Sequence, residues 1–118
     1  MNNTLIDARI AEMKINKSLK IKSGEGKILK AYIETQSSTD SDILVVNDFL
    51  FKNEFNSAYK ALKDNRVEEF ILNDRSSGLM QTLQYLLKKG CEIKGSLSYV
   101  KFVNVVGRIE EGLLIKLP

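Results

Sequence analysis

The sequence lacks several residue types on which common kinds of catalysis and metal binding depend. Its 118 residues include no histidine, no tryptophan, one proline and one cysteine, Cys91. Without histidine, the Ser-His-Asp and Cys-His nucleophile arrangements and all histidine-based zinc sites are excluded. An enzyme built on this chain would have to work through Asp, Glu, Lys or Tyr alone. We therefore expect a non-catalytic protein that holds no metal ion and no cofactor.

The single cysteine and the absence of long apolar runs bear on where the protein works. One cysteine cannot form an internal disulfide, so no oxidising compartment is implied. Cys91 follows Gly90 at the start of a predicted strand, which favours a buried, unreactive thiol. The sequence shows no apolar run of signal-peptide length and none approaching the roughly 20 residues of a membrane span. We expect a cytoplasmic protein with no membrane partner.

Composition and charge indicate one globular domain, residues 1–118. Hydrophobic residues make up 43% and charged residues 28%, values typical of a folded chain with one core. The net charge of +3 is unevenly distributed: Lys and Arg exceed Asp and Glu by seven to four in residues 1–36 and by six to three in residues 76–118. In residues 37–75 the acidic residues lead by eight to five. If the two basic ends of the chain meet in the fold, they would form one basic face. The alternative is that the net charge serves only to keep the protein in solution.

The first third of the chain predicts strands. Residues 10–22 carry aliphatic side chains that alternate with lysine, as in a half-buried strand. Ser23–Gly26 contains two glycines and predicts a hairpin turn, and residues 27–35 predict the returning strand. Residues 36–41 are polar and predict a loop. Ile43–Val46 is a short, continuous apolar run that suits a strand covered on both faces.

Two helices stand out in the middle of the chain. The first runs from Asp48 or Asn53 to Leu62, and the second follows Ser77 and ends before Gly90; both carry apolar residues every three or four positions. Strands are predicted at 67–72, 91–106 and 113–117. The resulting order, β-β-β-α-β-α-β-β, predicts an α+β fold with a small mixed sheet or β-barrel and two helices.

The segment before the second helix is a candidate anion site. Arg75, Ser76, Ser77 and Gly78 would place backbone N–H groups, hydroxyl groups and a guanidinium at a helix N-terminus, where a phosphate binds well. The alternative is that Asp74 or Ser76 caps the helix and that Arg75 is a solvated surface residue.

The last third carries residues suited to nucleic acid. Tyr99 and Lys101 share one face of a predicted strand, where a tyrosine ring could stack on a base and a lysine could neutralise a phosphate. Lys94, Lys20 and Lys22 would extend that surface. The alternative is that Tyr99 packs in the core and that the lysines protect an edge strand from aggregation.

Chain size, the mixed order of strands and helices, two helices in a β-rich body and the closing segment 107–117 resemble PUA-type modules, compact pseudo-barrels associated with RNA binding. The whole chain is also similar to the small PrgU-type proteins of pheromone-responsive conjugative plasmids in Gram-positive bacteria. This resemblance implies a PUA-like domain and a non-catalytic RNA-binding regulator that restrains production of plasmid-encoded surface adhesins. A protein-interaction module of the immunity or anti-defence type is the alternative, with Asp40, Asp42 and Asp48 meeting a basic partner protein.

Overall fold

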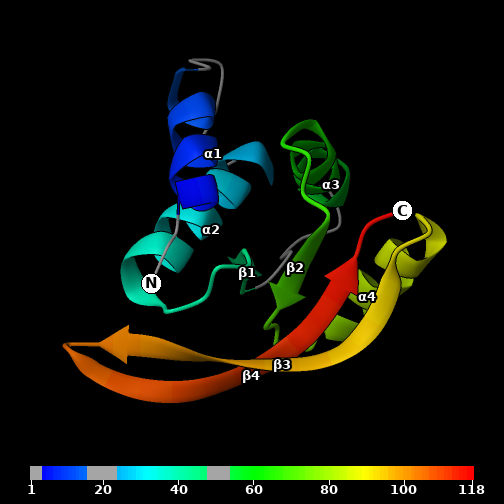
Figure 1. Cartoon of the computed structure of the whole chain (residues 1–118). Helices are drawn as coiled ribbons and strands as arrows, with labels where there is room; N and C mark the ends of the chain where they lie inside the picture. The colour runs from blue at the N-terminus through cyan, green and yellow to red at the C-terminus, as the bar shows by residue number, and fades with distance from the viewer. Residues whose placement is uncertain (1–3, 16–23, 48–53) are drawn as a thin grey trace.

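The computed structural model describes residues 4–15, 24–47 and 54–118 and shows an α+β fold with a mixed sheet, as expected (Figure 1). Within these residues the expectation of two helices is wrong, because the chain forms four. In chain order the elements are α1 (Thr4–Ile15), α2 (Gly24–Ser38), β1 (Val45–Val46), α3 (Phe55–Asp64), β2 (Glu69–Leu72), α4 (Leu79–Lys88), β3 (Glu92–Val103) and β4 (Val106–Lys116). None of the helices described here is long and apolar enough to cross a membrane.

The two strands predicted before residue 36 are helices in the structure. α1 covers residues 10–15 of the first predicted strand, and the rest of that strand, with Lys20 and Lys22, lies outside the described residues. α2 replaces the second. Its buried residues recur at helical spacing, namely Ile28, Ala31, Tyr32 and Thr35. This spacing, rather than the alternation of a strand, places one face of α2 in the core.

The predicted hairpin turn at Ser23–Gly26 is wrong in its described part, because Gly24 and Gly26 begin α2. Gly24 lies against α3, and its N–H donates to Ser57 Oγ at 3.0 Å. A Cβ atom at this position would overlap the Ser57 side chain and the backbone of Ala58. The glycine therefore permits two helices to approach closely and makes no turn. The ion pair between Lys27 Nζ and Glu54 Oε2, at 2.9 Å, joins the same two regions.

The sheet has the strand order β1-β2-β4-β3, in which β1 and β2 are parallel and the other pairs are antiparallel. The apolar run at Ile43–Val46 contains β1 as predicted, and Leu44, Val45 and Val46 are buried. β1 lies at the edge of the sheet. Thr35 of α2 covers that edge, because the Val45 N–H donates to Thr35 Oγ1 at 3.0 Å.

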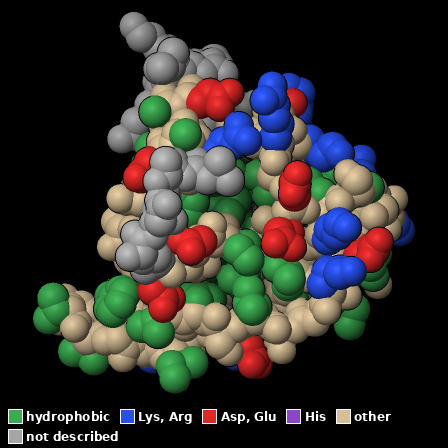
Figure 2. All heavy atoms as spheres, viewed as in Figure 1, with side chains coloured by type: hydrophobic (Ala, Val, Ile, Leu, Met, Phe, Trp, Pro, Cys, Tyr) green, Lys and Arg blue, Asp and Glu red, His purple; other side chains and the backbone are tan. Residues whose placement is uncertain are grey.

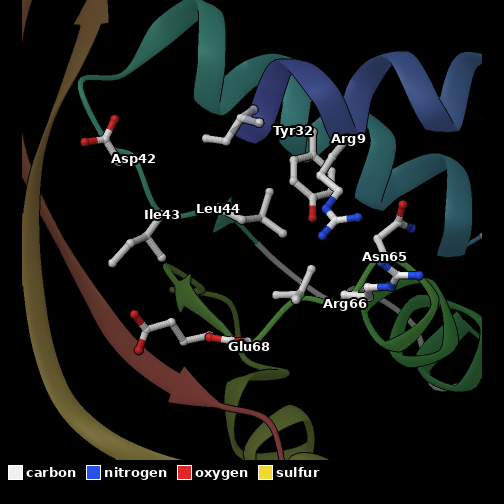
Figure 3. Close-up of a pocket in the computed structure, with 11 residues that line it drawn as sticks. Arg9, Tyr32, Asp42, Ile43, Leu44, Asn65, Arg66 and Glu68 are labelled. Carbon is white, nitrogen blue, oxygen red and sulfur yellow. The ribbon is translucent and has the colours of Figure 1, made fainter. Parts of the chain in front are cut away.

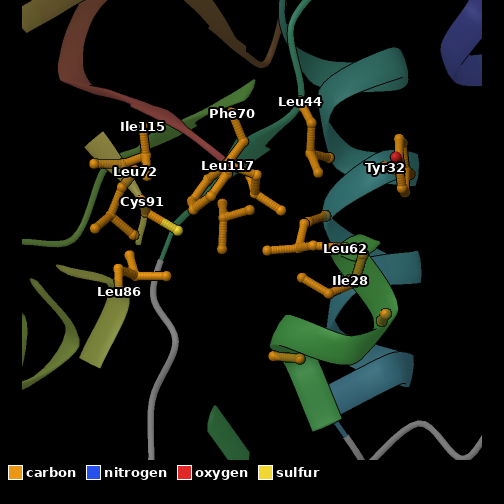
Figure 4. Close-up of a cluster of buried hydrophobic side chains, with 14 of the residues drawn as sticks. Ile28, Tyr32, Leu44, Leu62, Phe70, Leu72, Leu86, Cys91, Ile115 and Leu117 are labelled. Carbon is orange, nitrogen blue, oxygen red and sulfur yellow. The ribbon is translucent and has the colours of Figure 1, made fainter. Parts of the chain in front are cut away.

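The core lies between the sheet and the helices, and both helices predicted in the middle of the chain are confirmed as α3 and α4. Alternating residues of β2 point to opposite faces, so Phe70 and Leu72 join the large cluster with the helices (Figure 4) whereas Ile71 joins a smaller one. Gly90 has a φ of 92° directly after α4, the left-handed conformation that ends a helix. Cys91 is buried as predicted, and burial raises the pKa of its thiol.

β3 and β4 form one long hairpin that sweeps beneath α1, α2 and α3 in the view of Figure 1. Residues 107–112, which separate the predicted strands 91–106 and 113–117, lie inside β4. The hairpin instead turns at Asn104 and Val105, with φ values of 50° and 60°. We call residues 100–109 the hairpin arm. At its base the Val100 N–H donates to Asp40 Oδ1 at 2.7 Å, and the Asp40 N–H donates to the Val100 carbonyl at 3.0 Å.

Candidate functional site

A cavity of about 410 Å³ opens between α1, α2, the segment that precedes β1 and the connection from α3 to β2 (Figure 3). Its walls combine three kinds of side chain. Ile6, Leu44 and Val67 are among the apolar ones, Arg9 and Arg66 are cationic, and Asp42, Glu68 and Glu69 are acidic. We call it the arginine cavity. Its volume lies in the range of sites that bind small molecules or single nucleotides.

Arg9 and Tyr32 come from α1 and α2, and Figure 3 shows the Arg9 guanidinium beside the Tyr32 hydroxyl. Arg9 Nη1 also lies 3.3 Å from Glu12 Oε2. Tyr32 is only 3% exposed, and burial raises its pKa to about 12, an effect that the positive charge of Arg9 partly opposes. The phenol therefore stays neutral and can donate a hydrogen bond to a ligand across the physiological pH range.

Arg66 is the second residue after α3, and its side chain lines the same cavity. Asn65 closes the helix, with its side-chain Nδ2 donating to the Ala61 carbonyl at 2.8 Å. Arg66 then takes a φ of 56°, in the left-handed region where glycine is usual. A residue with a Cβ atom pays about 1 kcal/mol for this conformation. Arg66 therefore presents an exposed cationic side chain from a backbone conformation that is unfavourable in free energy.

A second hollow of about 490 Å³, which we call the lysine hollow, adjoins the arginine cavity and shares Arg66, Val67 and Glu68 with it. Lys63 of α3 and Lys116 of β4 line it, and Lys63 Nζ donates to the Pro118 carbonyl at 3.3 Å. Arg9, Lys63, Arg66 and Lys116 thus border two adjoining hollows, which the carboxylates of Asp42, Glu68 and Glu69 also line. We call the surface that carries these four cations the cationic face. Figure 2 shows basic side chains above and to the right of an apolar hollow that acidic side chains border.

The structure separates the residues that the sequence suggested for binding nucleic acid. Tyr99 is 5% exposed, packs with Val45 and Ile71, and accepts a hydrogen bond from Asn73 Nδ2 at 2.7 Å. Its ring is therefore not available to stack on a base, and the prediction of an open stacking strand is corrected to the alternative of a core tyrosine. On this face of β3, side chains of β1 and β2 pack against the tyrosine ring and cover it.

Of the two lysines of that predicted surface that the structure describes, Lys101 lies near Tyr99 and Lys94 does not. Lys101 is half-buried beside Glu34 in a small hollow of about 210 Å³ that Tyr99 also lines. Lys94 Nζ lies 3.7 Å from Glu92 Oε2 near the other end of β3. Lys20 and Lys22 lie outside the described residues.

At the start of α4, the groups expected to bind an anion already have partners within the chain. Asp74 Oδ1 accepts a hydrogen bond from the Ser76 N–H at 2.8 Å, and Ser76 Oγ accepts one from the Gly78 N–H at 3.2 Å. Arg75 Nη2 donates to the Glu111 carbonyl at 3.2 Å, and Ser77 is exposed. Asp74 and Ser76 therefore order the turn that precedes α4. Neither caps the helix with its side chain and Arg75 contacts Glu111, so the stated alternative is also not met in full.

The acidic residues of the middle segment do not form one surface. Asp40 holds the base of the hairpin arm, Asp42 lines the arginine cavity, and Asp48 lies outside the described residues. Among the residues that the structure describes, no three Cys, Asp or Glu side chains come close enough together to hold a metal ion.

Residues 27–103 match a family model described as a domain of unknown function (DUF7698). The chain belongs to this family. No curated protein and no solved structure matches it. The part of the chain that matches runs from α2 to β3, so it contains Tyr32, Lys63 and Arg66, whereas Arg9 and Lys116 lie outside it.

Proposed function

We propose that this protein is a non-catalytic RNA-binding module that contacts single-stranded RNA through the cationic face. One observation carries the proposal: Arg9, Lys63, Arg66 and Lys116 border two hollows that share Arg66. Cations spaced along adjoining hollows suit a phosphate backbone, and binding of this kind draws much of its free energy from counterion release.

The arginine cavity offers the complementary chemistry for a nucleobase. Its apolar wall, with Leu44 and Val67, can cover the flat face of a base, and the Tyr32 hydroxyl can donate a hydrogen bond. Carboxylates such as those of Asp42 and Glu68 accept hydrogen bonds from the amino and imino groups of bases. A guanidinium binds a phosphate with two parallel hydrogen bonds, which a lysine cannot do.

This proposal keeps the RNA ligand that the sequence suggested and changes the surface that binds it. The interface moves from the surface of β3 around Tyr99 to the two hollows around Arg66. A role in restraining the production of surface adhesins follows from the PrgU-type resemblance alone, and it stays a prediction. A basic protein partner on an acidic surface has less support, because Asp40 and Asp42 serve different parts of the fold.

The test is fluorescence anisotropy with short, labelled single-stranded RNA and DNA at two salt concentrations. We expect RNA to bind more tightly than DNA and binding to weaken as salt rises. Arg66→Gln should weaken binding and reduce the slope of log affinity against log salt by about one unit. Lys60→Gln is the matched control, because Lys60 is an exposed cation on α3, the helix that precedes Arg66, is paired with Asp64, and does not line either hollow.

A third variant separates binding from stability. Arg66→Gly should stabilise the fold, since glycine adopts the left-handed conformation freely, and should still lose affinity for RNA. The proposal fails if RNA does not bind at low salt. It also fails if Arg66→Gln and Lys60→Gln bind RNA equally well, because the cationic face would then not be the interface.

A further inference from the structure

The hairpin arm exposes apolar side chains on both of its faces and at its tip. From the strand register, Phe102 and Ile109 lie on one face, whereas Val103 and Val106 are paired on the other. Phe102 is 45% exposed, Val103 47%, Val105 98%, Val106 66% and Ile109 76%. Figure 1 shows the arm at the lower left, beyond the helices, and Figure 2 shows hydrophobic side chains gathered at its end.

Nothing within the described fold accounts for Val105. Its φ of 60° lies in the left-handed region, which a β-branched residue adopts at a cost. A two-residue turn of this type favours Asn-Gly, and here asparagine is followed by valine. Because its side chain is 98% exposed, packing on the rest of the chain does not compensate for the strain. A strained apolar residue at a protruding tip indicates a contact outside the chain.

The charges of the arm are of one sign. Residues 100–109 contain Lys101 and Arg108 and no Asp or Glu. These two cations face each other across the strands, on the same face of the arm as Val103 and Val106. Lys101 is half-buried beside Glu34, and Arg108 Nη2 lies 3.5 Å from Glu110 Oε1 below the arm. An apolar tip with a band of cations behind it matches the layered structure of an anionic bilayer surface, where acyl chains lie beneath phosphate groups.

We propose that the hairpin arm inserts its tip into the surface of a bilayer that contains anionic lipids. A groove on a partner protein would cover one face of the ribbon, whereas a bilayer surrounds the tip on all sides, as the exposure of both faces requires. The edge of β3 at Val100 is occupied by Asp40, so a partner strand cannot add there. The sequence predicted no membrane partner because it has no membrane-spanning segment. A hairpin tip that inserts only into the bilayer surface does not require such a segment.

The experiment is co-sedimentation of the full chain with vesicles of phosphatidylcholine, alone or mixed with phosphatidylglycerol. We expect binding to the mixed vesicles that weakens with salt, and little binding to phosphatidylcholine alone. Val105→Asp should reduce binding roughly tenfold, because it places a carboxylate at the depth of the acyl chains. Lys101→Gln and Arg108→Gln should each reduce it about fivefold.

Two controls isolate the arm from other surfaces. Met80→Asp changes an apolar side chain on α4 that is 66% exposed, and it should leave binding unchanged. Arg66→Gln should also bind vesicles normally, which separates this proposal from the RNA-binding one. Val105→Gly should lose affinity while relieving the strain of the turn, so its loss cannot be attributed to unfolding.

Four results would overturn the proposal. The first is no binding to the mixed vesicles at low salt, and the second is equal binding by the wild-type and Val105→Asp proteins. The third is a dimer in solution that Val105→Asp converts to a monomer, because the arm would then be an interface between copies of this chain. Binding of RNA that Val105→Asp abolishes would assign the arm to nucleic acid instead.

Discussion

Tyr32 links the arginine cavity to the stability of the fold. Burial raises its pKa from the ordinary 10.0 to about 12 in the folded protein. Below pH 10 the phenol is protonated in both the folded and the unfolded chain, so its full contribution to stability is present. As the pH rises from 10 towards 12 the unfolded chain releases the proton first, and this favours unfolding.

We therefore predict that the free energy of unfolding falls between about pH 10 and pH 12 by an amount on the order of 2 kcal/mol from Tyr32 alone. Urea unfolding of the wild type and of Tyr32→Phe, on both sides of pH 10, measures it. The pKa values of Tyr59, Tyr85 and Tyr99 are also raised by burial, so the difference between the two proteins is the relevant quantity. A difference that does not change with pH would contradict the prediction.

Arg66 and Val105 show the same relation between conformation and exposure. Each has a positive φ at a position where glycine would relieve strain, and each presents an exposed side chain to solvent. One carries a cation at a cavity and the other an apolar group at a hairpin tip. Substitution by glycine thus removes the side chain and stabilises the backbone at once, which lets the two proposed contacts be tested without loss of the fold.

At the scale of the elements, the local sequence pattern predicted a helix or strand correctly where the apolar residues that the element buries follow a regular spacing in the sequence. α3 and α4 were predicted because their apolar residues recur every three or four positions, and the stop at Gly90 is confirmed by its φ of 92°. β1 was predicted because a short apolar run suits a strand with two covered faces. In these cases the residues that determine the element are neighbours in the sequence.

Two glycines were misread for a common physical reason. Gly24 was expected in a turn and Gly112 just before the predicted strand 113–117, and both lie inside regular elements where another segment comes very close. Gly24 faces the backbone of α3, and Gly112 faces Ile71 and the Leu72 carbonyl of β2. A glycine that permits close packing and a glycine that permits a turn look alike in the sequence, because the neighbouring segment is distant along the chain.

The candidate site escaped sequence reasoning for a related reason. Arg9 and Arg66 belong to separate elements and come to one cavity only when α1, α2 and α3 pack together. Tyr99 was expected on an open strand, but its burial depends on β1 and β2, which the alternation within β3 does not reveal. The sequence contained one local indication of Arg66. It directly follows Asn65, which ends α3, at a position where glycine is usual.

The role of Gly24 gives a prediction for α2 and α3. Gly24→Ala should destabilise the protein by about 2 kcal/mol or more, because the added methyl group overlaps the backbone of Ala58 and the two helices must move apart. Gly78→Ala is the matched control. A Cβ there would lie 3.5 Å from Ser76 Oγ, an ordinary contact, so its effect should stay within about 0.5 kcal/mol. Equal urea midpoints for the two variants would show that Gly24 does not set the helix spacing.

At the scale of the whole molecule, β4 holds the sheet together. It pairs with β2 from Leu113 to Lys116 and with β3 along its full length, so β3 reaches the sheet through β4. Ile115 and the following Leu117 are buried in the large core cluster. The family match ends at Val103, the last residue of β3, and leaves β4 outside. The matched region alone therefore lacks the strand that joins its last element to the rest.

We predict that a chain ending at Val103 does not fold cooperatively, because it loses the central strand and two buried core residues at once. The matched control shortens the same hairpin but keeps all of the buried core residues. In it, Asn-Gly replaces Phe102–Gly107, so that Lys101 and Arg108 remain opposite each other across the strands. This shorter turn should leave the free energy of unfolding within about 1 kcal/mol of the wild type, since the deleted residues are largely exposed. Urea unfolding followed by far-UV circular dichroism distinguishes the two. A cooperative transition in the chain ending at Val103 would mean that β3 and the helices form a stable unit without β4, and the sheet order would then not determine the stability of the molecule.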